Sequence, residues 1–412
     1  MRHLLIIIAL FATSFLANGQ GIDGPWKGDL RIGMTKLAIV FHFQDGKCSM
    51  DSPDQGALGL PAEVEYMSAD SVCVTQKTAA IMFSGRLRDG AIVGRFSQGG
   101  LTVPLVLTPG DIERSRPQTP VGPFPYRTEE VSFNNGDVTL AGTLTYPEGW
   151  NGRKKVPVAI MVSGSGTQNR DEEIYGHKPF LVIADHLARN GIATLRYDDR
   201  GAGSSTGDAA SATTYDFMLD AEAGIDLLRS LKKFKKVGII GHSEGGEIAF
   251  MLGARNKVDY IVSLAGPGVQ GDSILLFQNL NALKLAGYPD MKITKEYVRA
   301  QIKAQKNPWL DYFIDYDPVQ DIRLIRCPAL FLNGDLDTQV EAEVNIHSIY
   351  ENLPKNRGGK GFANKHTGVT VYPSLNHLFQ HCQTGQADEY PEIEETISPE
   401  VLEDIARWIG NL

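Results

Sequence analysis

The stretch "KKVGIIGHSEGGEIAFMLGARN", residues 235–256, decides the fold. An apolar run ends at Gly241, and a helical pattern rich in alanine, leucine and methionine begins directly after Gly245 and Gly246. A strand that becomes a helix around one residue forces that residue into a strained backbone, and glycine is needed two positions before and after it. We therefore expect Ser243 to stand clear of a sheet edge, beside the N–H groups of a helix N-terminus.

A second segment has the same spacing of glycine and serine. Residues 203–207, "GSSTG", also match G-x-S-x-G. They lie in the polar loop "GAGSSTGDAASATT", and no helical pattern follows Ser205 directly. The local context therefore favours Ser243 as the nucleophile and predicts that Ser205 is a loop residue.

Residues 128–412 have the pattern of a single α/β domain. Apolar segments such as "VPVAIMVSGSG", "IATLRYDDRG", "VDYIVSLAG" and "CPALFLNGD" alternate with segments of helical length. Strands that are apolar almost throughout are buried on both faces, which predicts a mostly parallel sheet. Residues 268–326 contain no strand pattern. Their segments "ILLFQNLNALKLAG" and "TKEYVRAQIKAQ" predict helices of a cap insertion over the carboxyl edge of the sheet.

The residues before this domain divide into three parts. Residues 1–19, "MRHLLIIIALFATSFLANG", have a basic start, an apolar stretch and small residues at the end, which predicts a signal peptide and a secreted or periplasmic protein. Residues 20–112 alternate and are punctuated by turns, which indicates a small all-β domain, a barrel or a sandwich. Residues 113–127, "ERSRPQTPVGPFPYR", predict an extended proline-rich linker.

The composition of the chain limits the kinds of partner that it can bind. The 412 residues carry a formal net charge of −9, which argues against nucleic acid, because phosphate binding needs a basic face. No stretch after the signal peptide is long and apolar enough to cross a membrane. Of the four cysteines, Cys48 and Cys73 form either a disulfide or two separate buried thiols, and the sequence leaves both readings open.

A serine nucleophile needs a base and an orienting acid, and on this kind of sheet they follow it in the order acid, then histidine. The strand "PALFLNG" is followed by Asp335 and Asp337, which compete for the acid role. We favour Asp337, because the loop must leave the sheet before it reaches the base. For the base, His377 at the end of the last predicted strand is favoured over His366 and His381.

The oxyanion donors are expected at two places. One is the backbone N–H of Glu244, at the start of the helix after the nucleophile. The other belongs to the loop "GSGT" after the first parallel strand, where Ser165 or Gly166 is the expected donor.

Several of these motifs together resemble the α/β-hydrolase superfamily. "GHSEGG", "RYDDRGAGSSTG", "GSGTQNRDE", "LNGDLDTQV" and "LNHLFQ" are similar to those of its exported bacterial serine esterases, near the dienelactone-hydrolase-like branch, over residues 129–412. The resemblance implies a triad of Ser243, Asp337 and His377. It also implies structural roles for Asp199 and Arg200.

The chain departs from this pattern at two places. It carries Ser163-Gly164 where many relatives carry His-Gly, and the small β domain in front is not part of the superfamily fold. The first departure leaves the choice between Ser165 and Gly166 as oxyanion donor open.

The sequence therefore predicts a serine esterase that acts through an acyl-enzyme, on small-molecule or glycan-linked esters, and that needs no metal or cofactor. Two alternatives remain. A serine peptidase or amidase would use the same triad. A non-catalytic protein would bind glycans or lipids through residues 21–115.

Overall fold

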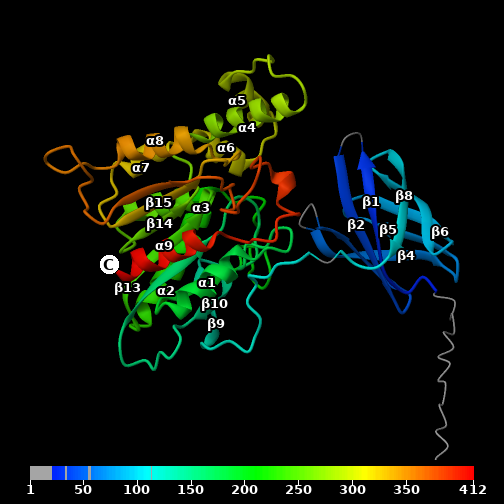
Figure 1. Cartoon of the computed structure of the whole chain (residues 1–412), viewed down its shortest axis with the longest axis horizontal. Helices are drawn as coiled ribbons and strands as arrows, with labels where there is room; N and C mark the ends of the chain where they lie inside the picture. Colours follow the sequence, from blue (N-terminus) through cyan, green and yellow to red (C-terminus); the bar gives the residue numbers. More distant parts are fainter. Residues whose placement is uncertain (1–20, 33–34, 54–56, 113) are drawn as a thin grey trace, which may run out of the picture. The chain divides into compact units, whose positions relative to one another are not determined.

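The computed structural model describes residues 21–32, 35–53, 57–112 and 114–412, so the predicted signal peptide lies outside the described residues. The chain divides into two compact units, Met1–Glu113 and Arg114–Leu412. Figure 1 shows the elements of each unit, and the two are described separately.

The first unit is a closed barrel of eight strands, each antiparallel to the next. Pairing of Trp26 with Pro109 and of Lys27 with Thr108 joins the first strand to the last. The sequence left a barrel or a sandwich open, and the structure is a barrel. The strands are β1 (Gly24–Ile32), β2 (Thr35–Gln44), β3 (Lys47–Ser52), β4 (Ala57–Met67), β5 (Ser71–Gln76), β6 (Ile81–Arg88), β7 (Ala91–Gln98) and β8 (Leu101–Pro109).

Large side chains fill the interior of the barrel. They form one buried cluster that includes Trp26, Phe41, Phe43, Phe83, Phe96 and Leu107. All four cysteines of the chain are free, so Cys48 and Cys73 are not joined in a disulfide. Burial raises the pKa of the Cys48 thiol to about 12, which makes this thiol unreactive near neutral pH.

The second unit is built on an eight-stranded sheet in the order β16-β15-β14-β13-β11-β12-β10-β9. An antiparallel hairpin forms one edge, and the other six strands are parallel. This is the α/β-hydrolase fold, as the sequence predicted. The strands are β9 (Thr128–Asn135), β10 (Val138–Thr145), β11 (Val156–Val162), β12 (Ala193–Tyr197), β13 (Phe234–His242), β14 (Ile261–Leu264), β15 (Ala329–Gly334) and β16 (Gly368–Tyr372).

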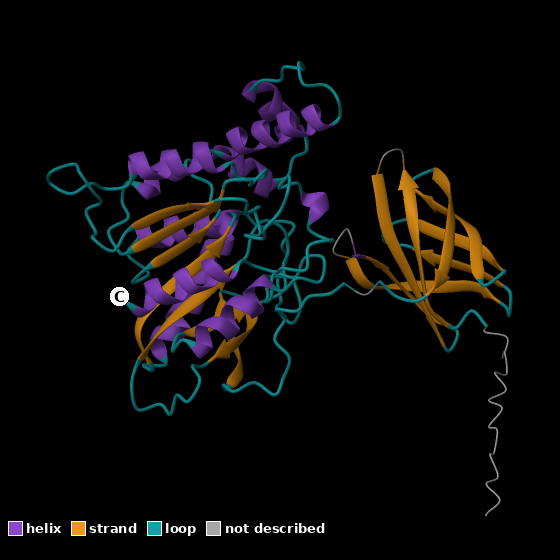
Figure 2. Cartoon of the chain, viewed as in Figure 1, coloured by secondary structure: helices purple, strands orange, loops and turns teal. Residues whose placement is uncertain are grey.

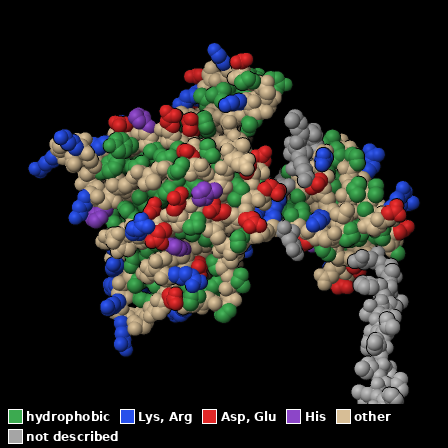
Figure 3. Space-filling view, in the orientation of Figure 1, with side chains coloured by type: hydrophobic (Ala, Val, Ile, Leu, Met, Phe, Trp, Pro, Cys, Tyr) green, Lys and Arg blue, Asp and Glu red, His purple; other side chains and the backbone are tan. Residues whose placement is uncertain are grey.

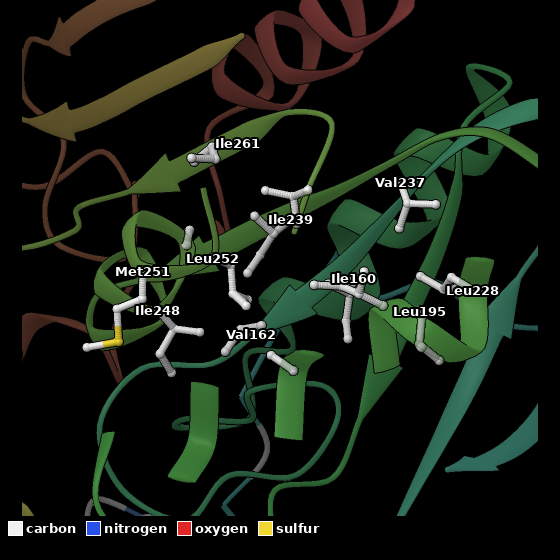
Figure 4. Packing of buried hydrophobic residues seen from close by; sticks show 14 of the residues in the cluster. Ile160, Val162, Leu195, Leu228, Val237, Ile239, Ile248, Met251, Leu252 and Ile261 are labelled. Atoms are coloured by element: carbon white, nitrogen blue, oxygen red, sulfur yellow. The ribbon is translucent and has the colours of Figure 1, made fainter. Parts of the chain in front are cut away.

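Helices cover both faces of this sheet (Figure 2). Because successive side chains of a strand point to opposite faces, Ile160 of β11 packs in one apolar cluster and Met161 in the other. The first cluster, part of which is drawn in Figure 4, includes residues of α2 (Thr214–Ser230), α3 (Glu244–Ala254) and α8 (Ala342–Asn352). The second includes residues of α1 (Pro179–Arg189) and α9 (Pro399–Gly410).

The cap insertion lies between β14 and β15. Its helices are α4 (Gly271–Leu285), α5 (Lys295–Ala304), α6 (Pro308–Asp315) and α7 (Pro318–Ile322). The two predicted helices correspond to α4 and α5, whereas α6 and α7 were not predicted because they are short. Their start signals are nonetheless present, since Asn307 and Asp317 cap helices that have proline at the first position.

The residues expected to form a linker make contacts within the second unit from residue 114 onwards. The Arg116 guanidinium donates hydrogen bonds to the carbonyls of Tyr175, Pro391 and Ile393. The Gln118 amide donates to the carbonyl of Ile397 at 2.7 Å. This segment is therefore held to the loops around the sheet rather than free of them.

The surface mixes charges of both signs. Figure 3 shows lysine and arginine side chains interspersed with aspartate and glutamate over the face that it draws. Among the described residues, no helix combines the length and apolarity that crossing a bilayer requires.

Candidate active site

Ser243 occupies the sharp turn between β13 and α3. Its backbone has φ 53° and ψ −118°, a conformation that a non-glycine residue adopts only under strain. A Cβ atom on Gly241 would overlap the carbonyl oxygen of Gly245, and one on Gly245 would overlap the carbonyl oxygen of Val162. The strained serine and the need for both glycines agree with the expectation from the sequence.

The helix that follows presents a free donor next to this serine. Ser243 donates its own N–H to the carbonyl of Leu264 at 2.8 Å, which anchors the turn to the neighbouring strand β14. Glu244 is the first residue of α3, and none of the described residues accepts a hydrogen bond from its N–H. This N–H is one of the unpaired donors at a helix N-terminus, where negative charge is stabilised.

The structure brings Asp337 and His377 together. They follow β15 and β16, both are buried, and Asp337 Oδ2 lies 2.7 Å from His377 Nδ1. The other carboxylate oxygen accepts hydrogen bonds from the backbone N–H groups of Gln339 and Val340, each at 2.8 Å. Asp337 is thereby fixed in position, and it holds the imidazole with Nδ1 towards the acid and Nε2 away from it.

The other candidates for the acid and the base form hydrogen bonds elsewhere. Asp335 accepts a hydrogen bond from the backbone N–H of Ser374 at 2.6 Å. His381 pairs with Glu395 near the surface, and the N–H of His366 donates to Asn364. Neither histidine lines the cavity that contains His377.

Ser243, Glu244 and His377 line one cavity of about 250 Å³. Within the part of the chain that the structure describes, the Ser243 hydroxyl makes no hydrogen bond to His377. Catalytic hydrogen bonds without substrate are often long and shorten in the complex, so this does not exclude the pair.

The loop after β11 supplies the second group of backbone donors. The N–H of Gly164 donates to Glu172 Oε1 at 2.7 Å, and the N–H of Gln168 donates to Asp199 at 2.9 Å. Between them, the N–H groups of Ser165 and Gly166 have no acceptor among the described residues. Ser165 lines the cavity and Gly166 does not, which favours Ser165 as the donor.

Asp199 and Arg200 hold the surrounding loops. Asp199 accepts hydrogen bonds from the Ser163 hydroxyl and from Gln168 N–H. Loss of solvation outweighs these hydrogen bonds and raises the pKa of Asp199 to about 8. Arg200 makes two hydrogen bonds of 2.7 Å to Asp220, a bidentate pair. Both contacts fit the structural roles that the sequence resemblance implied.

The cap insertion lines the cavity with apolar side chains. Trp309 and Phe313 of α6 stack with ring centroids 5.7 Å apart, and α4 adds Ile274 and Leu275. Trp309 Nε1 also donates to the Glu244 carboxylate at 2.8 Å. Sequence reasoning missed these aromatic residues because it missed α6, although the Asn307-Pro308 start signal was there to find.

The described residues contain one group of side chains with metal-ligand character, and it lies in the barrel. His42, Asp51 and Asp111 bring ligand atoms within 4.8 Å of one another. The two ring nitrogens of His42 face different carboxylates, at 2.8 Å for Asp51 and 3.9 Å for Asp111. This is the arrangement of ion pairs rather than of three ligands that converge on one ion.

Comparisons with known proteins found a family model and a relative to which this chain is similar. A family model described as serine aminopeptidase, S33, matches residues 179–319. Esterase EstD of Thermotoga maritima is 26% identical over 299 residues, which span 69% of this chain and 70% of that protein.

Two solved structures are also similar. The esterase Pf2001 of Pyrococcus furiosus has 19% identity and a TM-score of 0.48, covering 73% of this chain and 99% of its own. Est1E of Butyrivibrio proteoclasticus, solved with ferulic acid bound, has 18% identity and a TM-score of 0.44, covering 68% of this chain and 99% of its own.

Proposed function

We propose that this chain is a serine hydrolase that cleaves carboxylic esters through an acyl-enzyme on Ser243. The observation that carries the proposal is the combination of a strained serine on a strand–helix turn with a buried Asp337–His377 pair, around one cavity. The similarity to esterase EstD over 69% of the chain supports an ester as the substrate.

In the proposed mechanism, His377 Nε2 takes the proton of the Ser243 hydroxyl as the oxygen attacks the ester carbonyl. Asp337 holds the imidazole in the required tautomer and stabilises the imidazolium. The N–H groups of Glu244 and Ser165 stabilise the negative charge on the former carbonyl oxygen. His377 then protonates the leaving alcohol, and in the second half it activates the water that releases the acid.

The lining of the cavity favours a neutral, apolar acyl group. Its charged members are carboxylates and histidines, and the described lining contains no lysine or arginine. An acyl group that carries a free carboxylate would find no lysine or arginine in this described lining to pair with, and burying an unpaired charge is costly. Trp309 and Phe313 instead offer a flat apolar wall. Together with the predicted export, this supports acyl groups carried on glycans.

A peptidase on the same triad is the second candidate, because the matching family model is described as a serine aminopeptidase. The test is a series of p-nitrophenyl esters of increasing acyl length, together with acetylated and feruloylated xylan, against peptide p-nitroanilides. We expect ester turnover to dominate. Comparable kcat/KM on the anilides would overturn the esterase proposal.

Chemical labelling tests the nucleophile itself. A fluorophosphonate probe is expected to modify Ser243 and no other residue of the wild-type protein. Labelling and ester hydrolysis that persist in Ser243→Ala would end the proposal.

We also propose that the protein is exported with removal of residues 1–19. The mature chain would then begin at Gln20, which N-terminal sequencing of protein from the periplasm or the medium would check. Protein retained inside the cell with Met1 in place would contradict export and leave the catalytic proposal untouched.

A further inference from the structure

A second histidine lies directly beneath the site, paired with a glutamate. His242 is the last residue of β13, and Glu172 belongs to the loop between β11 and α1. Both are buried, with exposed fractions of 7% and 5%, and His242 Nδ1 lies 2.9 Å from Glu172 Oε1. The proposed mechanism does not use either side chain.

The pair is connected to both halves of the catalytic machinery. His242 Nε2 lies 3.0 Å from the carbonyl oxygen of His377, and the two imidazole centroids are 4.8 Å apart. Glu172 Oε1 also accepts the N–H of Gly164, in the loop that carries the expected oxyanion donor. One continuous chain of hydrogen bonds therefore runs from the oxyanion loop through Glu172 and His242 to the main chain of the base.

The hydrogen-bond partners indicate the protonation state of His242. Both ring nitrogens face an oxygen acceptor, and a neutral imidazole has only one N–H to donate. The imidazolium satisfies both contacts and balances the charge of Glu172. Burial alone would lower the pKa of His242, but the charge of Glu172, its hydrogen bond and that of the His377 carbonyl outweigh burial, and the pKa is raised.

The charged groups that act on His242 are few. Glu172 is in direct contact, and Asp337 acts from the far side of His377. The rest of the small space around the pair is lined by apolar side chains from α1, from the end of β14 and from the loops near the last helix. These are Pro179, Phe180, Ile183, Leu264, Leu378, Phe379 and Ile397. The described lining of this space contains no lysine or arginine that could compete for Glu172.

We propose that Glu172 and the His242 imidazolium form a positioning pair that fixes the His377 main chain and the oxyanion loop relative to one another. The inference rests on the proposed function, because it concerns how that site is held. Loss of the positive charge leaves His242 with one N–H, so either the contact to Glu172 or the contact to His377 must break. The base and the oxyanion donor then lose their common support.

Glu172→Gln tests the charge while it keeps an oxygen for Gly164 and for His242 Nδ1. Without the carboxylate, burial is the largest remaining influence on His242, so its pKa should fall below that in the wild type. Below this lowered pKa the variant retains both contacts and should keep the kcat that the wild type has at the same pH. Above it, kcat should fall about tenfold to a hundredfold, as expected for a small misplacement of catalytic groups, while KM changes less. The wild type should show no such fall in kcat over the same pH range.

Two further variants separate a positioning role from a structural one. His242→Gln on the Glu172→Gln background removes the titrating ring, so activity should be low and the descending limb should disappear. Glu395→Gln is the matched control, since it removes the carboxylate from the His381 pair, whose side chains are 56% and 24% exposed. Its profile should follow that of the wild type.

Nitrogen NMR of histidine-labelled protein reads the protonation state of His242 directly, and in the wild type it does so without any substitution. At the ordinary imidazole pKa of about 6.5, His242 should carry protons on both nitrogens to a larger extent in the wild type than in Glu172→Gln. A neutral His242 in the wild type, or a Glu172→Gln profile parallel to that of the wild type, would overturn the inference while Ser243 labelling and ester turnover stand. Loss of the proposed function would appear instead as activity that survives Ser243→Ala.

Discussion

Two segments of the second unit share the spacing G-x-S-x-G, and the structure gives their serines opposite surroundings. The Ser205 hydroxyl donates to the carbonyl of Asp198 at 2.6 Å and accepts the N–H of Ala141 at 2.9 Å. Ser243 stands on a strained turn and lines a cavity. The difference shows that the backbone around a serine, and not the spacing of nearby glycines, makes its hydroxyl available for chemistry.

The largest expected effect separates the two serines by activity. Ser243→Ala should lower kcat/KM on p-nitrophenyl esters by about 10⁴- to 10⁶-fold, because the covalent route is lost while the oxyanion donors remain. Ser205→Ala should leave kcat/KM within about twofold and should lower stability by about 1–3 kcal/mol, since it leaves the N–H of Ala141 unpaired. Steady-state kinetics and urea unfolding of both variants give the comparison. A large kinetic loss in Ser205→Ala would show that the two segments are not distinguished by their backbone.

The second comparison concerns the two aspartates after β15. Asp337→Asn should lower kcat about 10²- to 10⁴-fold, because an amide cannot accept the His377 Nδ1–H while it also receives the N–H groups of Gln339 and Val340 in the same way. Asp335→Asn should retain near wild-type kcat, since Asp335 only accepts a loop N–H. Kinetics near neutral pH on the same ester decide between them, and the reverse ranking would assign the acid role to Asp335.

The sequence predicted the parts of the fold and site that depend on local pattern. The sharp strand–helix turn at Ser243 could be predicted because its strand, glycines and helix are adjacent in the chain. The choice of Asp337 over Asp335 rested on how far a loop must travel, and the structure places Asp337 against His377. The Glu172–His242 contact joins residues 70 positions apart, in a loop whose path no periodicity describes. Trp309 was missed for a different reason, because an eight-residue helix is too short to show a repeat.

The third comparison exchanges the last glycine of each segment for alanine. In Gly245→Ala, the new methyl would overlap backbone oxygen atoms of Val162 and Ser163, which cannot move without the sheet, so we expect a loss of more than about 4 kcal/mol or failure to fold. A Cβ on Gly207 would have side-chain atoms as its three nearest neighbours, two methyl groups of Val138 at 3.1 Å and the Cβ of Arg200 at 3.4 Å, and φ +99° adds backbone strain. Gly207→Ala should therefore cost only about 1–3 kcal/mol. Chemical unfolding measures the free energy of unfolding of both variants. Equal losses would contradict the role assigned to close backbone packing at the turn around Ser243.

The smallest expected effect concerns the pH dependence of stability. It distinguishes two neighbouring aspartates, Asp198 and Asp199. Asp198 accepts hydrogen bonds from Arg170 and from the N–H of Ser204, beside Ser205, whereas Asp199 accepts them from the Ser163 hydroxyl and the N–H of Gln168, in the loop proposed to carry an oxyanion donor. Burial acts to raise the pKa of Asp198, but the hydrogen bonds and charge of Arg170 outweigh it and the pKa is lowered, whereas the pKa of Asp199 is raised to about 8.

The two shifts predict opposite dependences of stability on pH. A carboxyl with a lowered pKa stabilises the fold above its ordinary value, and this contribution is lost in acid. Asp199 instead keeps a proton in the folded state that the unfolded chain releases above about pH 4, so the free energy of unfolding falls as the pH rises from about 4 to about 8.

Asp199→Asn removes that slope, because asparagine has no proton to release. The fall in Tm between about pH 5 and pH 8 should therefore be smaller in this variant than in the wild type. Asp198→Asn should lower Tm near neutral pH and leave the slope between pH 5 and 8 as in the wild type. Calorimetric melting of both variants at four pH values measures these changes in Tm. Parallel Tm curves for the wild type and Asp199→Asn would mean that the Asp199 carboxyl is ionised in the folded protein. Its negative charge would then oppose the negative charge that the neighbouring loop is proposed to stabilise.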